Sequence, residues 1–222
     1  MRRHSWSTVG AGALALAITC ALAWWAYREA QKRELQRDVV ALVQDSTARL
    51  REALGLLTAD AQARSTLQAH FAALEGSAGR MQALDASVHP TLVQTAYAYV
   101  TDAHALLRRQ LALHAGRDAV RGDIGEINTH LRAAGTRSPE WIRQALALDQ
   151  RLQRNFFDYR LAAGGLEKSL RALDDTRLRL QTLVPAAAVI EQHLIFAAEK
   201  RLLELSTKLE QQVETARKLP GG

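Results

Sequence analysis

The chain has 222 residues, and its 29 Lys and Arg outnumber its 23 Asp and Glu to give a formal net charge of +6 at pH 7. The two signs are interspersed, so this mild excess does not indicate a nucleic-acid-binding protein, and we expect no nucleic-acid partner. The one cysteine, Cys20, lies in an apolar run, which excludes disulfides and cysteine metal sites from the rest of the chain. Four prolines among abundant Ala, Leu, Arg, Gln and Glu are typical of long helices.

The first predicted element begins with an uncharged apolar run from Val9 to Tyr27. At 1.5 Å per helical residue this run is about long enough to cross a hydrocarbon core of roughly 30 Å. Trp24 and Trp25 stand where aromatic residues gather at a membrane interface. We therefore predict an N-terminal transmembrane helix, with residues 1–27 as a single-span anchor and residues 28–222 as an all-helical domain.

Two other interpretations of this run stay open. The basic start MRRHS and the site Ala21-Leu22-Ala23 resemble a cleaved secretory signal, although the bulky Trp24 follows that site. Cys20 fits a lipoprotein signal, although Ala17-Ile18-Thr19 is a poor match to the residues that normally precede the lipidated cysteine. An uncleaved signal-anchor is the interpretation that the length of the run favours.

The orientation of the anchor is predicted from its flanks. Arg2 and Arg3 precede the run, and a basic amino terminus ahead of a first apolar segment is how export signals begin. The opposite flank is also basic, with Arg28, Lys32, Arg33 and Arg37. A count of Lys and Arg alone would therefore place the large domain in the cytoplasm. We expect the amino terminus inside and the bulk of the chain extracytoplasmic, as a periplasmic domain at a bacterial-type inner (plasma) membrane.

Helix start and stop signals divide the chain into five predicted helices. They cover approximately residues 9–57, 60–84, 90–134, 139–184 and 185–218. Ser138-Pro139-Glu140 is a strong helix start, because it combines a capping hydroxyl, proline at the first helical position and an acid near the positive helix end. Pro90 and Pro185 are predicted to open helices in the same way, and Asp60 to cap the second helix.

Apolar residues spaced by three and four along the last three helices predict their packing. In the fourth helix they are Leu152, Phe156, Tyr159, Ala163, Leu166, Leu170, Leu173, Leu180 and Val184, interrupted by Arg177. Such seams pack helices at about +20° in bundles and coiled coils. The predicted fold is therefore all-α, an elongated antiparallel helical bundle with coiled-coil-like seams and no strands, and a seam could also support a homo-oligomer.

A polar break in the third helix is the candidate site. His114 and Asp118 follow the apolar stripe on one face, and a hairpin turning near Thr136 would place His114 opposite Tyr159 and Arg117 opposite Asn155. An arginine fork matches carboxylates and phosphates, so this set could bind a small anion between residues 90–134 and 139–184. The candidate ligand-binding residues are Arg108, His114, Arg117, Asp118, Asn155 and Tyr159. The competing interpretations are a polar layer that sets the register between helices, or arginines on a solvated helix face.

Metal and enzyme chemistry find little support in the sequence. Glu126 and His130 are four residues apart on one helix face, but no further ligand completes a metal set. His70 and His104 could approach one another across a helical hairpin. There is no Gly-rich phosphate loop, nucleophile elbow or HExxH motif. We expect no metal, no cofactor and no catalysis.

The predicted architecture resembles the exported all-helical sensor domains of bacterial membrane receptors, in which a long helix leaves the first span and enters a bundle. The resemblance covers residues 28–222 and implies no particular site residue. Two functions are therefore predicted. The first is a non-catalytic, single-pass membrane-anchored scaffold or protein-interaction module with a protein partner. The alternative is a sensory accessory domain that binds a small anion and acts through a separate membrane signalling partner.

Overall fold

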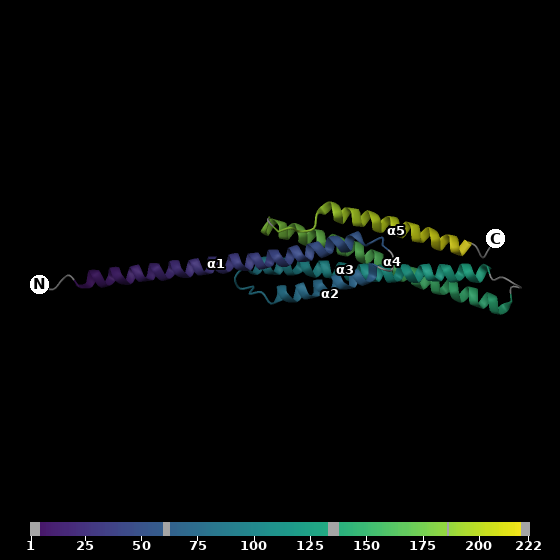
Figure 1. Cartoon of the computed structure of the whole chain (residues 1–222), viewed down its shortest axis with the longest axis horizontal. Helices are drawn as coiled ribbons and strands as arrows, with labels where there is room; N and C mark the ends of the chain where they lie inside the picture. The colour runs from purple at the N-terminus through teal and green to yellow at the C-terminus, as the bar shows by residue number, and fades with distance from the viewer. Residues whose placement is uncertain (1–4, 60–62, 133–137, 186, 219–222) are drawn as a thin grey trace.

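The computed structural model describes residues 5–59, 63–132, 138–185 and 187–218, with the backbone alone for residues 5–15 and 17. The elements are α1 (Ser5–Gly55), α2 (Ala63–Gln82), α3 (Pro90–Arg132), α4 (Pro139–Leu183) and α5 (Gln192–Lys218). Successive helices run in opposite directions along one long axis (Figure 1). These ranges contain no strand. The prediction of an all-α antiparallel bundle is confirmed.

The first helix is unbroken over 51 residues, as the sequence predicted. Its amino-terminal part projects beyond the other four helices (Figure 1), and Leu35 is the first buried side chain among those that the structure describes. Among the residues described, no helix is both long enough and apolar enough to cross a membrane. The transmembrane segment therefore stays a prediction from the sequence.

The predicted start of the fourth helix is confirmed in atomic detail. Ser138 has an extended backbone, and its hydroxyl accepts a hydrogen bond from the Trp141 N–H at 3.2 Å. Pro139 occupies the first helical turn, where the N–H that it lacks has no helical partner. The predicted cap at Asp60 and the predicted turn near Thr136 lie outside the described residues.

The predicted start of the last helix at Pro185 is wrong, because α5 begins at Gln192. Tertiary contacts hold the residues before it in an irregular conformation. The N–H of Ile190 donates to the hydroxyl of buried Tyr99 at 3.0 Å, and Glu191 accepts two hydrogen bonds from Arg51. The Tyr99 hydroxyl takes the place of the backbone acceptor that a helix would offer to the Ile190 N–H. Short turns at Ala187 and Val189 complete this irregular segment, although its alanines favour helix.

The third helix is the centre of the bundle, because it contacts all four of the other helices. Buried residues therefore surround it, and the single stripe predicted from the sequence covers only part of its buried surface. On this helix Tyr97 is 37% exposed, whereas Tyr99, two residues later, is fully buried. The predicted seam of α4 is confirmed at Leu166 and Leu170, which are both buried in the core.

Candidate functional site

The polar break of α3 faces the carboxyl-terminal end of α1. The Nε2 of Gln110 donates to the carbonyl oxygen of Ala53 at 2.7 Å. Two turns further along α3, Arg117 donates to the carbonyl oxygens of Thr58 (3.5 Å) and Ala59. Both polar side chains are buried. Ala53 lies in the last turn of α1, whereas Thr58 and Ala59 follow the end of that helix at Gly55. Gln110 and Arg117 therefore hold the end of α1 and the turn after it from a neighbouring helix.

His114 lies between these two residues and supports Arg117. Its Nδ1 is 3.1 Å from Nη2 of Arg117, which requires a neutral imidazole that accepts the hydrogen bond. Burial lowers the pKa of His114 below its ordinary 6.5, and the charge of Arg117 lowers it further, although the Asp118 carboxylate opposes both. The histidine is therefore held in its neutral form.

Asp118 completes this cluster at the edge of the core. Its carboxylate accepts a hydrogen bond from Nη2 of Arg64 on α2 at 2.7 Å and lies 3.9 Å from Nε of Arg117. The structure thus brings three of the predicted site residues together, namely His114, Arg117 and Asp118. Arg108 does not join them. It is exposed, and its charge adds to burial in lowering the pKa of His104.

The predicted pairing between α3 and α4 is shifted by two residues. Tyr159 lies opposite Gly116, not His114, and a Cβ added to Gly116 would be 3.2 Å from the Tyr159 Cα. Gly116 thus faces α4, and at 100° per helical residue His114 lies about 200° and Arg117 about 100° around α3 from it. His114 and Arg117 are therefore turned away from α4, and Arg117 meets the turn that follows α1.

The other two predicted site residues make different contacts. Asn155 donates from Nδ2 to the Asp123 carboxylate at 2.6 Å, and Arg151 donates to the same carboxylate at 2.6 Å. The hydroxyl of Tyr159 is 3.3 Å from that of Ser206 on α5, and burial raises its pKa. This contact of Asp123 was not predicted from the sequence, although Arg151 and Asn155 are hydrogen-bond donors one turn apart on α4.

These contacts favour a structural role for the polar break, because the Arg117 fork already binds backbone carbonyls. The anion-binding site stays a prediction.

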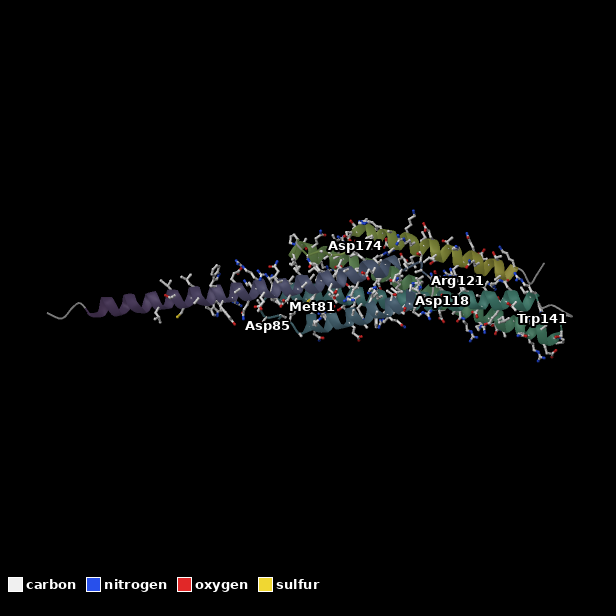
Figure 2. The ribbon with its side chains drawn as sticks, in the orientation of Figure 1. Met81, Asp85, Asp118, Arg121, Trp141 and Asp174 are labelled. Atoms are coloured by element: carbon white, nitrogen blue, oxygen red, sulfur yellow. The ribbon has the colours of Figure 1, made fainter. Side chains whose placement is uncertain are left out.

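The two side chains considered as metal ligands, Glu126 and His130, make other contacts. Glu126 pairs with Arg151, and His130 contacts the Trp141 carbonyl at 3.1 Å and stacks on its ring, near the end of the molecule farthest from the amino terminus (Figure 2). Within the described ranges, no group of three His, Cys, Asp or Glu could hold a metal ion.

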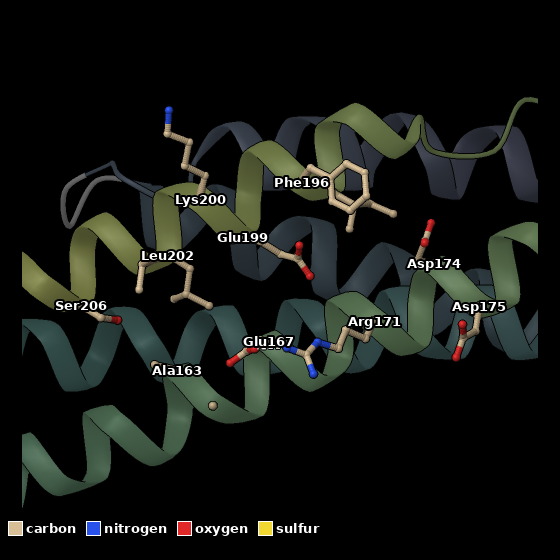
Figure 3. Close-up of a pocket in the computed structure, with 13 residues that line it drawn as sticks. Ala163, Glu167, Arg171, Asp174, Asp175, Phe196, Glu199, Lys200, Leu202 and Ser206 are labelled. Atoms are coloured by element: carbon tan, nitrogen blue, oxygen red, sulfur yellow. Dashed lines mark hydrogen bonds and ion pairs between the residues drawn. The ribbon is translucent and has the colours of Figure 1, made fainter.

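An open groove between α4 and α5 was not predicted from the sequence. It has a volume of about 1000 Å³, and Figure 3 shows Phe196 and Glu199 directed from α5 towards α4. We define the α4–α5 groove by its lining residues Ala163, Gly164, Glu167, Arg171, Asp174, Asp175, Ile195, Phe196, Glu199, Lys200, Leu202, Leu203 and Ser206. Phe196 and Leu203 directly follow the buried residues Ile195 and Leu202, so they lie outside the buried seam of α5. Large apolar residues grouped at such exposed positions indicate contact with a partner.

Further large apolar side chains are exposed on the outer face of α4. Phe157 is 61% exposed and Leu161, one turn later, is 59% exposed. Ile142 and Leu146 repeat this spacing nearer to the amino-terminal end of the helix. The outer surface of α4 and α5 therefore carries apolar area that nothing in the described part of the chain covers.

Comparisons of the chain with protein-family models, with curated proteins and with solved structures found no match. Function is therefore inferred from the chemistry of this chain alone.

Proposed function

We propose that the protein is a non-catalytic, single-pass membrane-anchored scaffold that presents a rigid helical bundle to a protein partner. One observation carries this proposal: apart from Tyr97 on α3, the exposed large apolar side chains that the structure describes fall in two separate places. One group is on the projecting part of α1, and the other is on the outer faces of α4 and α5. A membrane would cover the first group, and a partner would cover the second.

The anchoring part of the proposal is supported by the residues of α1 outside the bundle. Leu22, Trp24, Trp25 and Tyr27 are all more than half exposed. The guanidinium of Arg28 lies 5.0 Å from the ring centre of Trp24. Tryptophan and tyrosine followed by cations suit the boundary between lipid and water. An unbroken helix from this boundary into the core would hold the bundle upright on the membrane.

The partner-binding part of the proposal is supported by the long buried seam. Leucines fill the interior from α1 to α5, so Phe157, Leu161, Phe196 and Leu203 are not needed for the core. Exposed apolar area beyond what the core needs marks surfaces of protein interaction, where a few anchor residues supply most of the binding free energy.

Photo-crosslinking in intact cells tests this function. A photoreactive amino acid at Phe157 or Leu161 should give discrete products of higher mass, whereas the same residue at Gln68, an exposed polar position on α2, should not. The full chain should also stay with the membrane after an alkaline carbonate wash. Equal labelling at Gln68 and at the apolar positions, or release of the chain by carbonate, would contradict the proposal.

A further inference from the structure

We propose that the α4–α5 groove binds a basic amphipathic helix of the protein partner, an inference that rests on the proposed scaffold function. A helix in a groove is a common mode of recognition, in which apolar residues about one turn apart enter the groove and the flanking residues set the charge preference. The shape, the lining and the charge of the groove each support this occupant.

The shape of the groove results from small residues on α4 facing large ones on α5. Gly164 and Ala163 leave the α4 wall low, and a Cβ added to Gly164 would meet nothing within 4 Å. On α5, Phe196 and Leu203 are 55% and 68% exposed and lie two helical turns apart. From Gly164 to Asp175 the α4 wall extends about 16 Å, or about three helical turns.

The charge of the groove selects a cationic occupant. Glu167 pairs with Arg171, Asp174 pairs with Arg177, and Lys200 of the groove pairs with Glu204, so these six residues neutralise one another. Asp175 and Glu199 line the same groove and form no ion pair with any residue that the structure describes. These two unpaired carboxylates give the groove a negative charge, whereas the whole chain has a net charge of +6. Lysine or arginine beside the apolar residues of the occupant would complement them.

The test uses the full chain in nanodiscs of zwitterionic lipid and a fluorescent peptide of about 14 residues, four helical turns of Leu and Lys in amphipathic order. A peptide with Glu in place of Lys is the charge control, and nanodiscs without protein give the lipid background. We expect the fluorescence anisotropy to report binding of the Lys peptide at least about tenfold tighter than that of the Glu peptide.

Two matched pairs of variants locate the binding site. Gly164→Leu fills the groove, whereas Gly122→Leu makes the same change at another open glycine on α3. Glu199→Lys reverses a groove carboxylate, whereas Glu210→Lys reverses an exposed carboxylate three turns later on α5. Gly164→Leu and Glu199→Lys should each lower the affinity for the Lys peptide about tenfold or more. The two control variants should bind the peptide with the affinity of the wild type. Circular dichroism should show an intact fold for all four.

Three outcomes would overturn the inference: no binding of the Lys peptide above the lipid background, equal binding of the Glu peptide, or unchanged binding by Gly164→Leu. Self-association of the wild type that Gly164→Leu abolishes would assign the groove to a second copy and overturn it as well. If cross-links at Phe157 and Leu161 persist in any of these cases, the scaffold function stands and only the groove assignment is lost. If those cross-links are absent, the scaffold function itself fails.

Discussion

At the scale of single residues, the buried arginine of α3 is the clearest case of a group with a structural task. Arg117 is 3% exposed, and its guanidinium is surrounded by the carbonyls of Thr58 and Ala59 and by the ring of His114. A buried charge without such partners would be strongly unfavourable. The residue therefore joins the end of α1 to the middle of α3.

Replacement of this arginine should destabilise the fold. Arg117→Ala leaves two carbonyls without their charged donor, and we expect the free energy of unfolding to fall by about 1.5–3 kcal/mol. Arg117→Lys should recover only part of this loss, because lysine cannot span both carbonyls with a planar fork. Urea unfolding of the full chain in mild detergent measures the change, with exposed Arg108→Ala as the control, for which we expect a change within about 0.5 kcal/mol.

The same variants separate the two interpretations of the polar break. If the break binds an anion, phosphate or a small carboxylate should raise the melting temperature of the wild type in proportion to its concentration over its dissociation constant. Arg117→Ala should then lose that shift. A destabilised Arg117→Ala together with no stabilising anion would leave the structural layer as the role of these residues.

Two histidines make stability depend on pH. Burial is the main cause of the lowered pKa of His104 and of His114 in the folded chain. Just below pH 6.5 the unfolded chain therefore binds more protons than the folded chain does. The free energy of unfolding should have its highest value above that pH and should fall as the pH drops towards the folded pKa values. Melting curves between pH 8 and pH 5 measure the slope. His114→Gln with His104→Gln should flatten it, and an unchanged slope would show that other groups cause it.

At the scale of helices, the contact between α3 and α4 depends on one glycine. Gly116 lies against the backbone of Tyr159, at 3.2 Å from a built Cβ to the Tyr159 Cα, and a backbone atom cannot move aside as a flexible side chain can. Gly122, less than two turns away on the same helix, faces open space. The close approach that seats Tyr159 is therefore specific to position 116.

A pair of alanine substitutions tests this contact. Gly122→Ala should stabilise the chain by up to about 1 kcal/mol, because alanine favours helix over glycine. Gly116→Ala gains the same propensity but forces α3 and α4 apart, so we expect a net loss of about 1–2 kcal/mol. Thermal melts of the two variants measure the difference, and equal stabilisation by both would show that the helices do not meet at Gly116.

The seam of α4 gives a second prediction for this element. Leu166 and Leu170 are buried in the core, whereas Leu161 is mostly exposed on the outer face. Leu166→Ala and Leu170→Ala should each lower the free energy of unfolding by about 2–5 kcal/mol, because each leaves a cavity. Leu161→Ala should change it by less than about 0.5 kcal/mol. Equal losses at all three positions in urea unfolding would place Leu161 in the interior.

At the scale of the whole molecule, α1 has two different surroundings along its length. Up to Tyr27 its described side chains are exposed, and from Leu35 it contributes to the core. At 1.5 Å per residue its 51 residues extend about 77 Å, so the proposed membrane segment and the bundle share one rigid rod. Any tilt of this helix at the membrane would therefore move the whole bundle.

The orientation of this rod can be measured directly. A reporter enzyme that is active only outside the cytoplasm, fused after Gly222, should be active if the amino terminus is inside. Activity only with a cytoplasmic reporter would reverse the orientation, as the basic residues after Tyr27 would then have dominated. Mass spectrometry of the purified chain should find residues near Met1, and a mature form beginning near Trp24 would identify a cleaved signal.

The sequence by itself determined the helical class and most of the helix ends. Pro90, Pro139 and Ser138 act on the backbone of their own helical turn, so they are readable without knowledge of any neighbour. The apolar spacing of α4 and α5 is likewise a property of one helix. These features depend on contacts between residues at most a few positions apart.

Which neighbouring helix each apolar or polar helix face contacts was decided only by the tertiary structure. Gly116, not His114, meets Tyr159 of α4, and Arg117 faces the turn after α1. The apolar spacing of a single helix does not specify this register. The late start of α5 depends on the hydroxyl of Tyr99, which is 91 positions from its partner Ile190. The α4–α5 groove likewise exists only where two helices with small and large residues face one another. These features are set by contacts that are distant in the chain, whereas helix propensity and caps act locally.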